Sequence, residues 1–208
     1  MIEYVIPENP DDRILEKASR ALESGELIAF PTDTNWIVAC SPWSKQGLES
    51  LYRFKGESQQ KHFAFLCESI AQASELAVIS DSAYRLIRTR LPGHYTLIFE
   101  ATKMATKLVK ASKTDHEVGI RIPPSPMVLK FIKFHGRPIL STNVTRDLLD
   151  IDEESEIYSV LIEEKIGHQL SMILDPGEYD FTGPSTIVDF SQGVSPVLVR
   201  KGAGQLFF

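Results

Sequence analysis

The stretch Leu27-Ile28-Ala29-Phe30-Pro31-Thr32-Asp33-Thr34 decides the fold class of this chain. Its apolar half lies between Gly25 and Pro31 and is typical of a strand buried inside a sheet. Ligands bind at the carboxyl ends of strands in open α/β sheets, so the two hydroxyls and the carboxylate that follow predict one wall of a polar pocket. The alternative is that Thr32 or Asp33 caps the next segment, a common role for these residue types.

Length and composition predict a single domain over residues 1–208. The chain is 43% hydrophobic and 24% charged, which are ordinary values for a globular protein. Its net charge of −6 argues against a generally basic nucleic-acid binder but allows a local basic cleft. No apolar run reaches membrane-spanning length and the N-terminus lacks a signal-peptide pattern, so we expect a cytoplasmic protein without membrane contact.

Helix and strand patterns alternate along the chain. The first expected helix lies between the cap sequence Asn9-Pro10-Asp11-Asp12 and Gly25, and the second begins after Ser44 and ends at Gly56. Further helices are expected over 81–91, 125–134 and near 153–166, and strands over 27–30, 63–66, 95–99, 118–122 and 138–140, with short strands near Met172, Thr186 and Val197. This alternation favours an α/β fold with a mixed sheet covered by helices.

Several common chemistries are excluded by their missing motifs. The chain has no G-x-x-x-x-G-K-[ST] phosphate loop, no complete dinucleotide fingerprint and no G-x-S-x-G elbow. Its five histidines lack metal-ligand spacing, and Cys40 and Cys67 are too few and too far apart for a disulfide framework or a zinc site. We therefore expect no metal site made of protein side chains alone.

Polar clusters follow the expected strands in a fixed order. They are Thr32-Asp33-Thr34, Pro92-Gly93-His94-Tyr95-Thr96, Arg121-Ile122-Pro123, Ser141-Thr142-Asn143, Pro184-Ser185-Thr186 and Arg200-Lys201-Gly202. With Lys55 and Lys61, this order resembles the YrdC/YciO family, whose threonylcarbamoyl-adenylate synthases carry P-T-[DE]-T, P-G-x-x-T, R-x-P, S-A-N, S-T-[IV] and L-R-x-G motifs. The resemblance covers roughly residues 10 to 204. It implies a YrdC-like twisted mixed sheet flanked by helices, with a large concave ligand cleft.

Two stretches are similar to the YciO branch of that family. The segments 61–67 and 92–98 are closer to the H-N-F-T-L-M-C and P-G-x-Y-T motifs of this branch than to the K-P-L and P-G-P-x-T motifs of the synthases.

The resemblance implies a nucleotidyl-transfer chemistry. The synthases condense L-threonine, bicarbonate and ATP into threonylcarbamoyl-AMP and release pyrophosphate, for the t6A modification of tRNA. Such a reaction needs two anions held in position and charge stabilised as pyrophosphate departs, and it needs no covalent nucleophile. ATP is therefore the expected nucleotide substrate, with Mg²⁺ sharing the charge of its phosphates.

The resemblance also assigns roles to individual residues, and no residue is given a covalent catalytic role. Thr32, Thr34, Arg121 and Ser185 would bind threonine, and Lys55, Lys61, Thr96, Ser141, Asn143 and Arg200 would bind the nucleotide. Arg121 stands in an otherwise apolar strand, where a buried guanidinium needs an anionic partner. Lys55 and Lys61 have the alternative of solvated charges at a helix end, and Arg200 that of a charge at a sheet edge.

The chain departs from the synthase pattern at several positions. Glu57 stands two residues after Lys55, where synthases carry arginine, and places a negative charge near the expected phosphates. Asn35-Trp36-Ile37-Val38 stands in place of the V-Y-G-L motif of the synthases. Thr142 replaces the alanine of the S-A-N motif, and the S-G pair that follows this motif is absent from Val144-Thr145-Arg146. These departures leave open a YciO-type protein that binds nucleotide, tRNA or double-stranded RNA with little or different catalytic activity.

Overall fold

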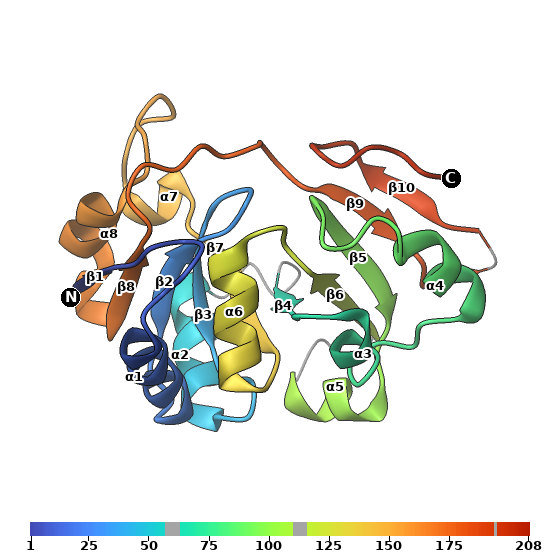
Figure 1. Cartoon of the computed structure of the whole chain (residues 1–208), viewed down its shortest axis with the longest axis horizontal. Coiled ribbons are helices and arrows are strands. Elements are labelled where there is room, and N and C mark those ends of the chain that lie inside the picture. The colour runs from blue at the N-terminus through green and yellow to red at the C-terminus, as the bar shows by residue number, and fades with distance from the viewer. Residues whose placement is uncertain (57–62, 110–115, 194) are drawn as a thin grey trace.

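The computed structural model describes residues 1–56, 63–109, 116–193 and 195–208. Within these ranges ten strands form one mixed sheet in the order β1-β8-β2-β3-β7-β4-β6-β5-β9-β10 (Figure 1). The strands are β1 (Ile2–Tyr4), β2 (Ile28–Pro31), β3 (Trp36–Cys40), β4 (Ala64–Leu66), β5 (Tyr95–Glu100), β6 (Glu117–Arg121), β7 (Ile139–Asn143), β8 (Met172–Asp175), β9 (Thr186–Asp189) and β10 (Val197–Arg200). The sheet contains both parallel pairs (β1 with β8, β8 with β2, β4 with β6, β5 with β9) and antiparallel pairs, which confirms the predicted mixed α/β sheet.

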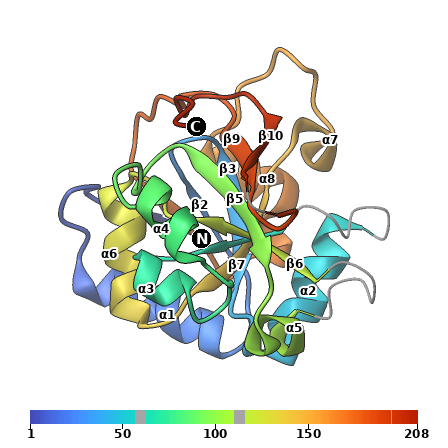
Figure 2. The ribbon, with the colours of Figure 1, turned by 90° about the vertical axis from the view of Figure 1, so that its right-hand side faces the viewer.

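Helices lie on both faces of this sheet, as Figures 1 and 2 show. They are α1 (Asp12–Glu23), α2 (Lys45–Lys55), α3 (Ile70–Ala73), α4 (Asp81–Ile87), α5 (Lys103–Leu108), α6 (Pro126–His135), α7 (Arg146–Leu149) and α8 (Ser159–Ile166), followed by the 3₁₀ helix η2 (Gly167–Gln169). The predicted caps are present in the first two: Asp11 accepts a hydrogen bond from the Arg13 amide, and Ser44 from the Gly47 amide. No helix in the described ranges is long and apolar enough to cross a lipid bilayer.

The continuous apolar run of β2 is explained by burial on both faces. Ile28 and Phe30 pack with α1 and α6 in one hydrophobic cluster, whereas Leu27 and Ala29 belong to the other cluster, which includes residues of α2 and α8. Side chains of a strand point alternately to opposite faces, so a strand between two helix layers has no polar positions.

The segment that follows β2 is a turn and not a helix, and Thr32 caps that turn, since its Oγ1 accepts a hydrogen bond from the Thr34 amide at 3.4 Å. The Thr32 amide donates to the Asn35 carbonyl oxygen at 2.9 Å, so residues 32–35 form a tight turn between β2 and the antiparallel strand β3. A hairpin needs only two residues between its strands, so the chain reverses before a helix can begin.

Three predicted boundaries are also corrected. The helix expected near 153–166 begins at Ser159, because the closely spaced acidic side chains of 150–156 repel one another in helical geometry. The helix expected over 81–91 ends at Ile87. The residues Ser141-Thr142-Asn143 lie within β7 rather than after it, since each pairs with a residue of β3.

Candidate functional site

A cavity of about 1580 Å³ lies over the middle of the sheet. Residues of β4, β5 and β6 line its floor, β7 and α7 line one wall, and the segment from Tyr179 to Ser185 with β9 and β10 lines the other. Sites for small ligands usually measure about 300–1,000 Å³, so this cavity has room for a nucleotide and a second small substrate. It supplies the large ligand cleft that the family resemblance implies.

Arg121 is fixed in the wall by an internal ion pair. Its Nη2 atom donates to Asp33 Oδ1 at 2.7 Å, and both side chains are buried, at 6% and 4% exposure. Burial lowers the pKa of Arg121, the Asp33 carboxylate acts in the opposite direction, and nearby Arg200 lowers it further. Arg121 Nε is buried and has no hydrogen-bond partner among the described residues. A guanidinium that is anchored by a carboxylate and also lines the cavity is suited to bind an anion there.

Asp33 is held by more than Arg121. Its Oδ2 atom lies 2.7 Å from His94 Nδ1, and its main-chain carbonyl oxygen accepts hydrogen bonds from Thr182 N at 3.0 Å and Thr182 Oγ1 at 2.9 Å. The turn before β5 and the segment before β9, which are far from the β2–β3 turn in the sequence, therefore both bond to Asp33. Asp33 fixes the position of Arg121 and was not assigned a role from the sequence.

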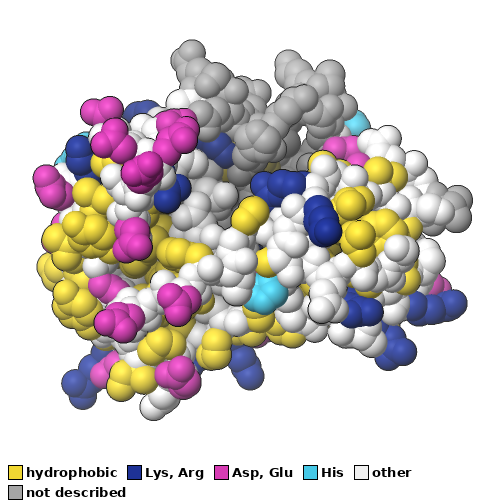
Figure 3. All heavy atoms as spheres, turned by 90° about the horizontal axis from the view of Figure 1, so that it is seen from above, with side chains coloured by type: hydrophobic (Ala, Val, Ile, Leu, Met, Phe, Trp, Pro, Cys, Tyr) yellow, Lys and Arg dark blue, Asp and Glu magenta, His cyan; other side chains and the backbone are white. Residues whose placement is uncertain are grey.

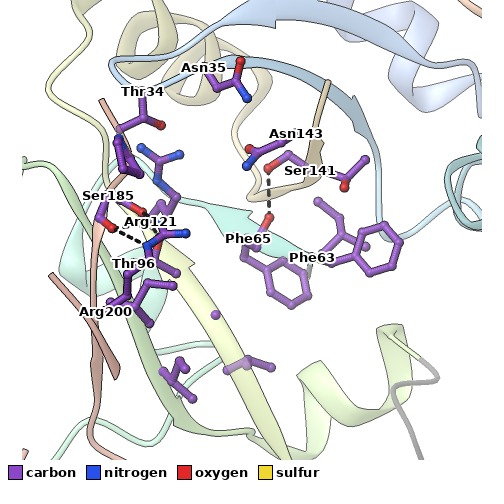
Figure 4. A pocket seen from close by; sticks show the side chains of 18 of the residues that line it. Thr34, Asn35, Phe63, Phe65, Thr96, Arg121, Ser141, Asn143, Ser185 and Arg200 are labelled. Carbon is purple, nitrogen blue, oxygen red and sulfur yellow. Dashed lines mark hydrogen bonds between the residues drawn. The ribbon is translucent and has the colours of Figure 1, made fainter. Parts of the chain in front are cut away.

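Thr96, Ser185 and Arg200 form a second cluster on the same side of the cavity (Figure 4). The Thr96 and Ser185 hydroxyl oxygens lie 2.8 Å apart. Arg200 donates to the Ser185 carbonyl oxygen from Nη2 at 2.8 Å and from Nε at 3.1 Å, and Nη2 lies 3.2 Å from Ser185 Oγ. Arg200 lies near Arg121, so this wall holds two guanidinium groups, and the carboxylates of Asp33 and Asp180 lie on the same side.

The opposite wall presents the end of β7. Ser141 Oγ donates to the Ala64 carbonyl oxygen at 3.1 Å, while buried Thr142 Oγ1 has no partner among the described residues. Asn143 is exposed at the strand end, and the side chain of Asn35 lies close by, donating to the Val144 carbonyl oxygen at 3.2 Å. Amide and hydroxyl groups therefore line this wall (Figure 4).

Most residues predicted for the site meet at this cavity. The lining residues among them are Thr34, Thr96, Arg121, Ser141, Asn143, Ser185 and Arg200. Thr32 is fully buried behind the wall, where its Oγ1 donates to the Asn35 carbonyl oxygen at 3.1 Å and shapes the turn.

Of the two predicted lysines only Lys55 is described, and it does not appear among the lining residues. Lys55 is buried, its Nζ lies 4.6 Å from the centre of the Phe63 ring, and burial lowers its pKa to about 8. Lys61, like Glu57, lies outside the described residues.

Four residues of the site received no role from the sequence: Asp33, which was predicted only as part of the pocket wall, and His94, Asn35 and Arg146. Asp33 and His94 lie inside the quoted clusters, and Arg146 was noted only as part of a departure from the family pattern. A buried arginine implies a nearby acid, which is the signal that could have selected Asp33.

The charge of the molecule is strongly segregated. The segment 147–180 holds eleven of the 28 acidic residues and one of the 22 lysines and arginines, so the rest of the chain has an excess of positive charge. Figure 3 shows Asp and Glu side chains gathered on the side of α7 and α8, with Lys and Arg more frequent toward the opposite side. The negative net charge of the chain therefore comes from residues 147–180, and the rest of the chain is net positive.

Comparison with known proteins identifies the family. A model of the Sua5, YciO and YrdC proteins, described as telomere recombination, matches residues 20–202. The chain belongs to this family. YciO of Escherichia coli is 27% identical over 203 residues, which cover 98% of this chain and 96% of YciO. The E. coli YciO crystal structure has a TM-score of 0.86 at 26% identity and covers 99% of this chain and 97% of that one.

Relatives with a named activity are also similar. The mouse threonylcarbamoyl-AMP synthase is 28% identical over 194 residues, 90% of this chain and 66% of the synthase. P. abyssi Sua5, crystallised with L-threonine, has a TM-score of 0.81 at 24% identity and covers 97% of this chain and 57% of Sua5; it shares the fold. The family and the YciO branch predicted from residues 61–67 and 92–98 are thereby confirmed.

Proposed function

We propose that this family member makes threonylcarbamoyl-AMP from L-threonine, bicarbonate and ATP, releasing pyrophosphate, for t6A modification of tRNA. The observation that carries the proposal is the guanidinium of Arg121, fixed by buried Asp33 in the wall of a cavity large enough for two substrates. The similarity to the mouse synthase supports it.

Threonine would bind at the wall that holds Arg121. Its carboxylate can accept a charge-assisted hydrogen bond from the part of the Arg121 guanidinium that lines the cavity. The hydroxyls of Thr34 and Ser185 line the same wall and can bond to the remaining polar groups of the amino acid.

ATP would occupy the rest of the cavity. Thr96, Ser141, Asn143 and Arg200 supply hydroxyl, amide and guanidinium donors suited to phosphate and ribose oxygens. The described residues contain no cluster of three or more side chains that could hold a metal ion. This fits Mg²⁺ that is bound mainly by phosphates and water, with Glu156 or Asp180 as the cavity carboxylates that could contact it.

The reaction requires orientation rather than covalent catalysis. The threonine amine attacks the carbon of bicarbonate and water is lost, which leaves a carbamate; a carbamate oxygen then bonds to the α-phosphorus while the bond to pyrophosphate breaks. Arg121 would hold the threonine carboxylate and so keep the carbamate oxygen in line with the α-phosphorus. The hydrogen-bond donors on the nucleotide side would stabilise the charge of the departing pyrophosphate. Burial raises the pKa of Cys40 to about 12 and that of Cys67 as well, so neither thiol is an activated nucleophile.

A second candidate is a YciO-type protein that binds nucleotide and tRNA or double-stranded RNA without this synthesis. The likeness to YciO over nearly the whole of both chains favours it. The positive charge left outside residues 147–180 supports RNA contact despite the overall charge of −6. Binding to tRNA should then weaken steeply as salt rises.

Pyrophosphate release separates the two candidates. The synthase predicts release that requires threonine, bicarbonate and ATP together, and silence of the pure protein with all three would exclude it. Because Glu57 replaces the arginine of the synthases, Glu57→Arg should raise activity or ATP affinity, whereas Glu153→Arg makes the same charge change in the acidic segment and should raise neither.

A further inference from the structure

Three arginines line the cavity among the described residues, and two of them are on one wall. Arg121 is paired with Asp33, and Arg200 is bound to Ser185. The carboxylates of Asp33 and Asp180 on the same wall offset these two charges, so the wall leaves little positive charge for a triphosphate. The third arginine, Arg146, lines the cavity from α7, next to the end of β7.

Arg146 is oriented by its surroundings. It is the first residue of α7, whose N-cap Thr145 accepts a hydrogen bond from the Leu148 amide. Arg146 Nε donates to the Ser155 carbonyl oxygen at 2.9 Å, and the residue is exposed. No ion pair joins Arg146 to a carboxylate within the part of the chain that the structure describes. Arg146 directly precedes the acidic segment 147–180, and acidic residues line the cavity itself.

Those acids are few. Glu117, Glu156 and Asp180 are the acidic lining residues among those described, and Glu117 Oε1 already accepts hydrogen bonds from Ser191 and Gln192. Glu156 and Asp180 would repel a bare triphosphate but attract one that carries a divalent cation. This arrangement favours a metal-bound polyphosphate over a simple anion.

We propose that Arg146 binds the β- and γ-phosphates of the nucleotide, so that the polyphosphate lies along the β7–α7 wall and the amino acid along the Arg121 wall. The choice of ligand rests on the proposed function. Arg146 stands where the family wording has the S-G pair, and it supplies a cation in a chain whose Glu57 replaces a phosphate-side arginine. A guanidinium presents a planar pair of donors that fits phosphate oxygens.

Calorimetric titration of the full chain with four probes tests this placement: Mg-ATP, magnesium tripolyphosphate, AMP and adenosine. Arg146→Ala should weaken binding of Mg-ATP and tripolyphosphate about tenfold, the usual size of one lost hydrogen bond to a charged group. Adenosine and AMP should bind as they do to the wild type. Arg146→Lys, which keeps the charge, should recover part of the affinity for tripolyphosphate.

Arg13→Ala is the matched control, since Arg13 is an exposed arginine of α1 outside the cavity lining. The placement is overturned when Arg146→Ala binds Mg-ATP like Arg13→Ala, or when it loses affinity for adenosine to the same degree as for Mg-ATP. Pyrophosphate release is a separate readout. If polyphosphate binding depends on Arg146 but the protein releases no pyrophosphate with threonine, the placement of Arg146 is supported and the synthase activity is excluded. If Arg146→Ala releases pyrophosphate with an unchanged KM for ATP, the synthase activity is supported and the placement of Arg146 is excluded.

Discussion

Asp33→Asn tests whether the ion pair with Arg121 holds the site together. The two side chains are 4% and 6% exposed and 2.7 Å apart, so the substitution leaves a buried guanidinium without its counter-charge. Removing one partner of such a pair usually costs about 3–5 kcal/mol. For a chain of this size the melting temperature should fall by roughly 6–20 °C.

Urea unfolding, followed by the fluorescence of buried Trp36, measures this loss directly. Asp180→Asn is the matched control, because Asp180 is an exposed aspartate at the same cavity and should change stability by less than about 0.5 kcal/mol. The double variant Asp33→Asn/Arg121→Met removes both charges and should be more stable than Asp33→Asn alone. The reasoning is refuted when Asp33→Asn lies within about 1 kcal/mol of the wild type, or when the double variant is less stable than the single one.

Three further predictions concern stability and the shape of the site. Burial lowers the pKa of His135, so the neutral form is favoured in the fold. The free energy of unfolding should therefore fall as the pH drops below about 6.5, by at most about 1.4 kcal/mol per pH unit. His135→Gln should remove that part of the pH dependence in urea titrations. A Cβ at Gly202 would lie 2.1 Å from the Pro184 carbonyl oxygen and 2.5 Å from the Ser185 carbonyl carbon. Gly202→Ala should therefore lower the free energy of unfolding by about 1–3 kcal/mol and weaken threonine binding. The control Gly167→Ala should do neither, because a Cβ there meets only the flexible Glu163 side chain. Thr142→Val removes a buried hydroxyl without a described partner and should raise the melting temperature of the ligand-free protein, and a decrease would show that the hydroxyl is satisfied.

Features that depend on neighbours in the sequence were predicted well. The caps Asp11 and Ser44, and the buried strand 28–31, follow from local hydrogen bonding and from apolar runs. Strand β3 was not predicted although Trp36–Cys40 is entirely buried, because a continuous apolar run does not identify its own conformation. Ser141-Thr142-Asn143 has a different cause: its polar residues suggest a strand end, whereas backbone pairing with β3 continues β7 through Asn143.

The sequence by itself determined the family, the mixed α/β fold and most of the polar residues that line the cavity, because these follow from local patterns and from the order of short motifs. Only the tertiary structure decided which of them act together. Asp33 and Arg121 are 88 positions apart, and Ser185 reaches Thr96 across 89. Such partners are chosen by strand order and burial, since a buried charge must find its counter-charge wherever the fold brings one within hydrogen-bond distance. For the same reason only the structure could place Arg146 on the lining of the cavity.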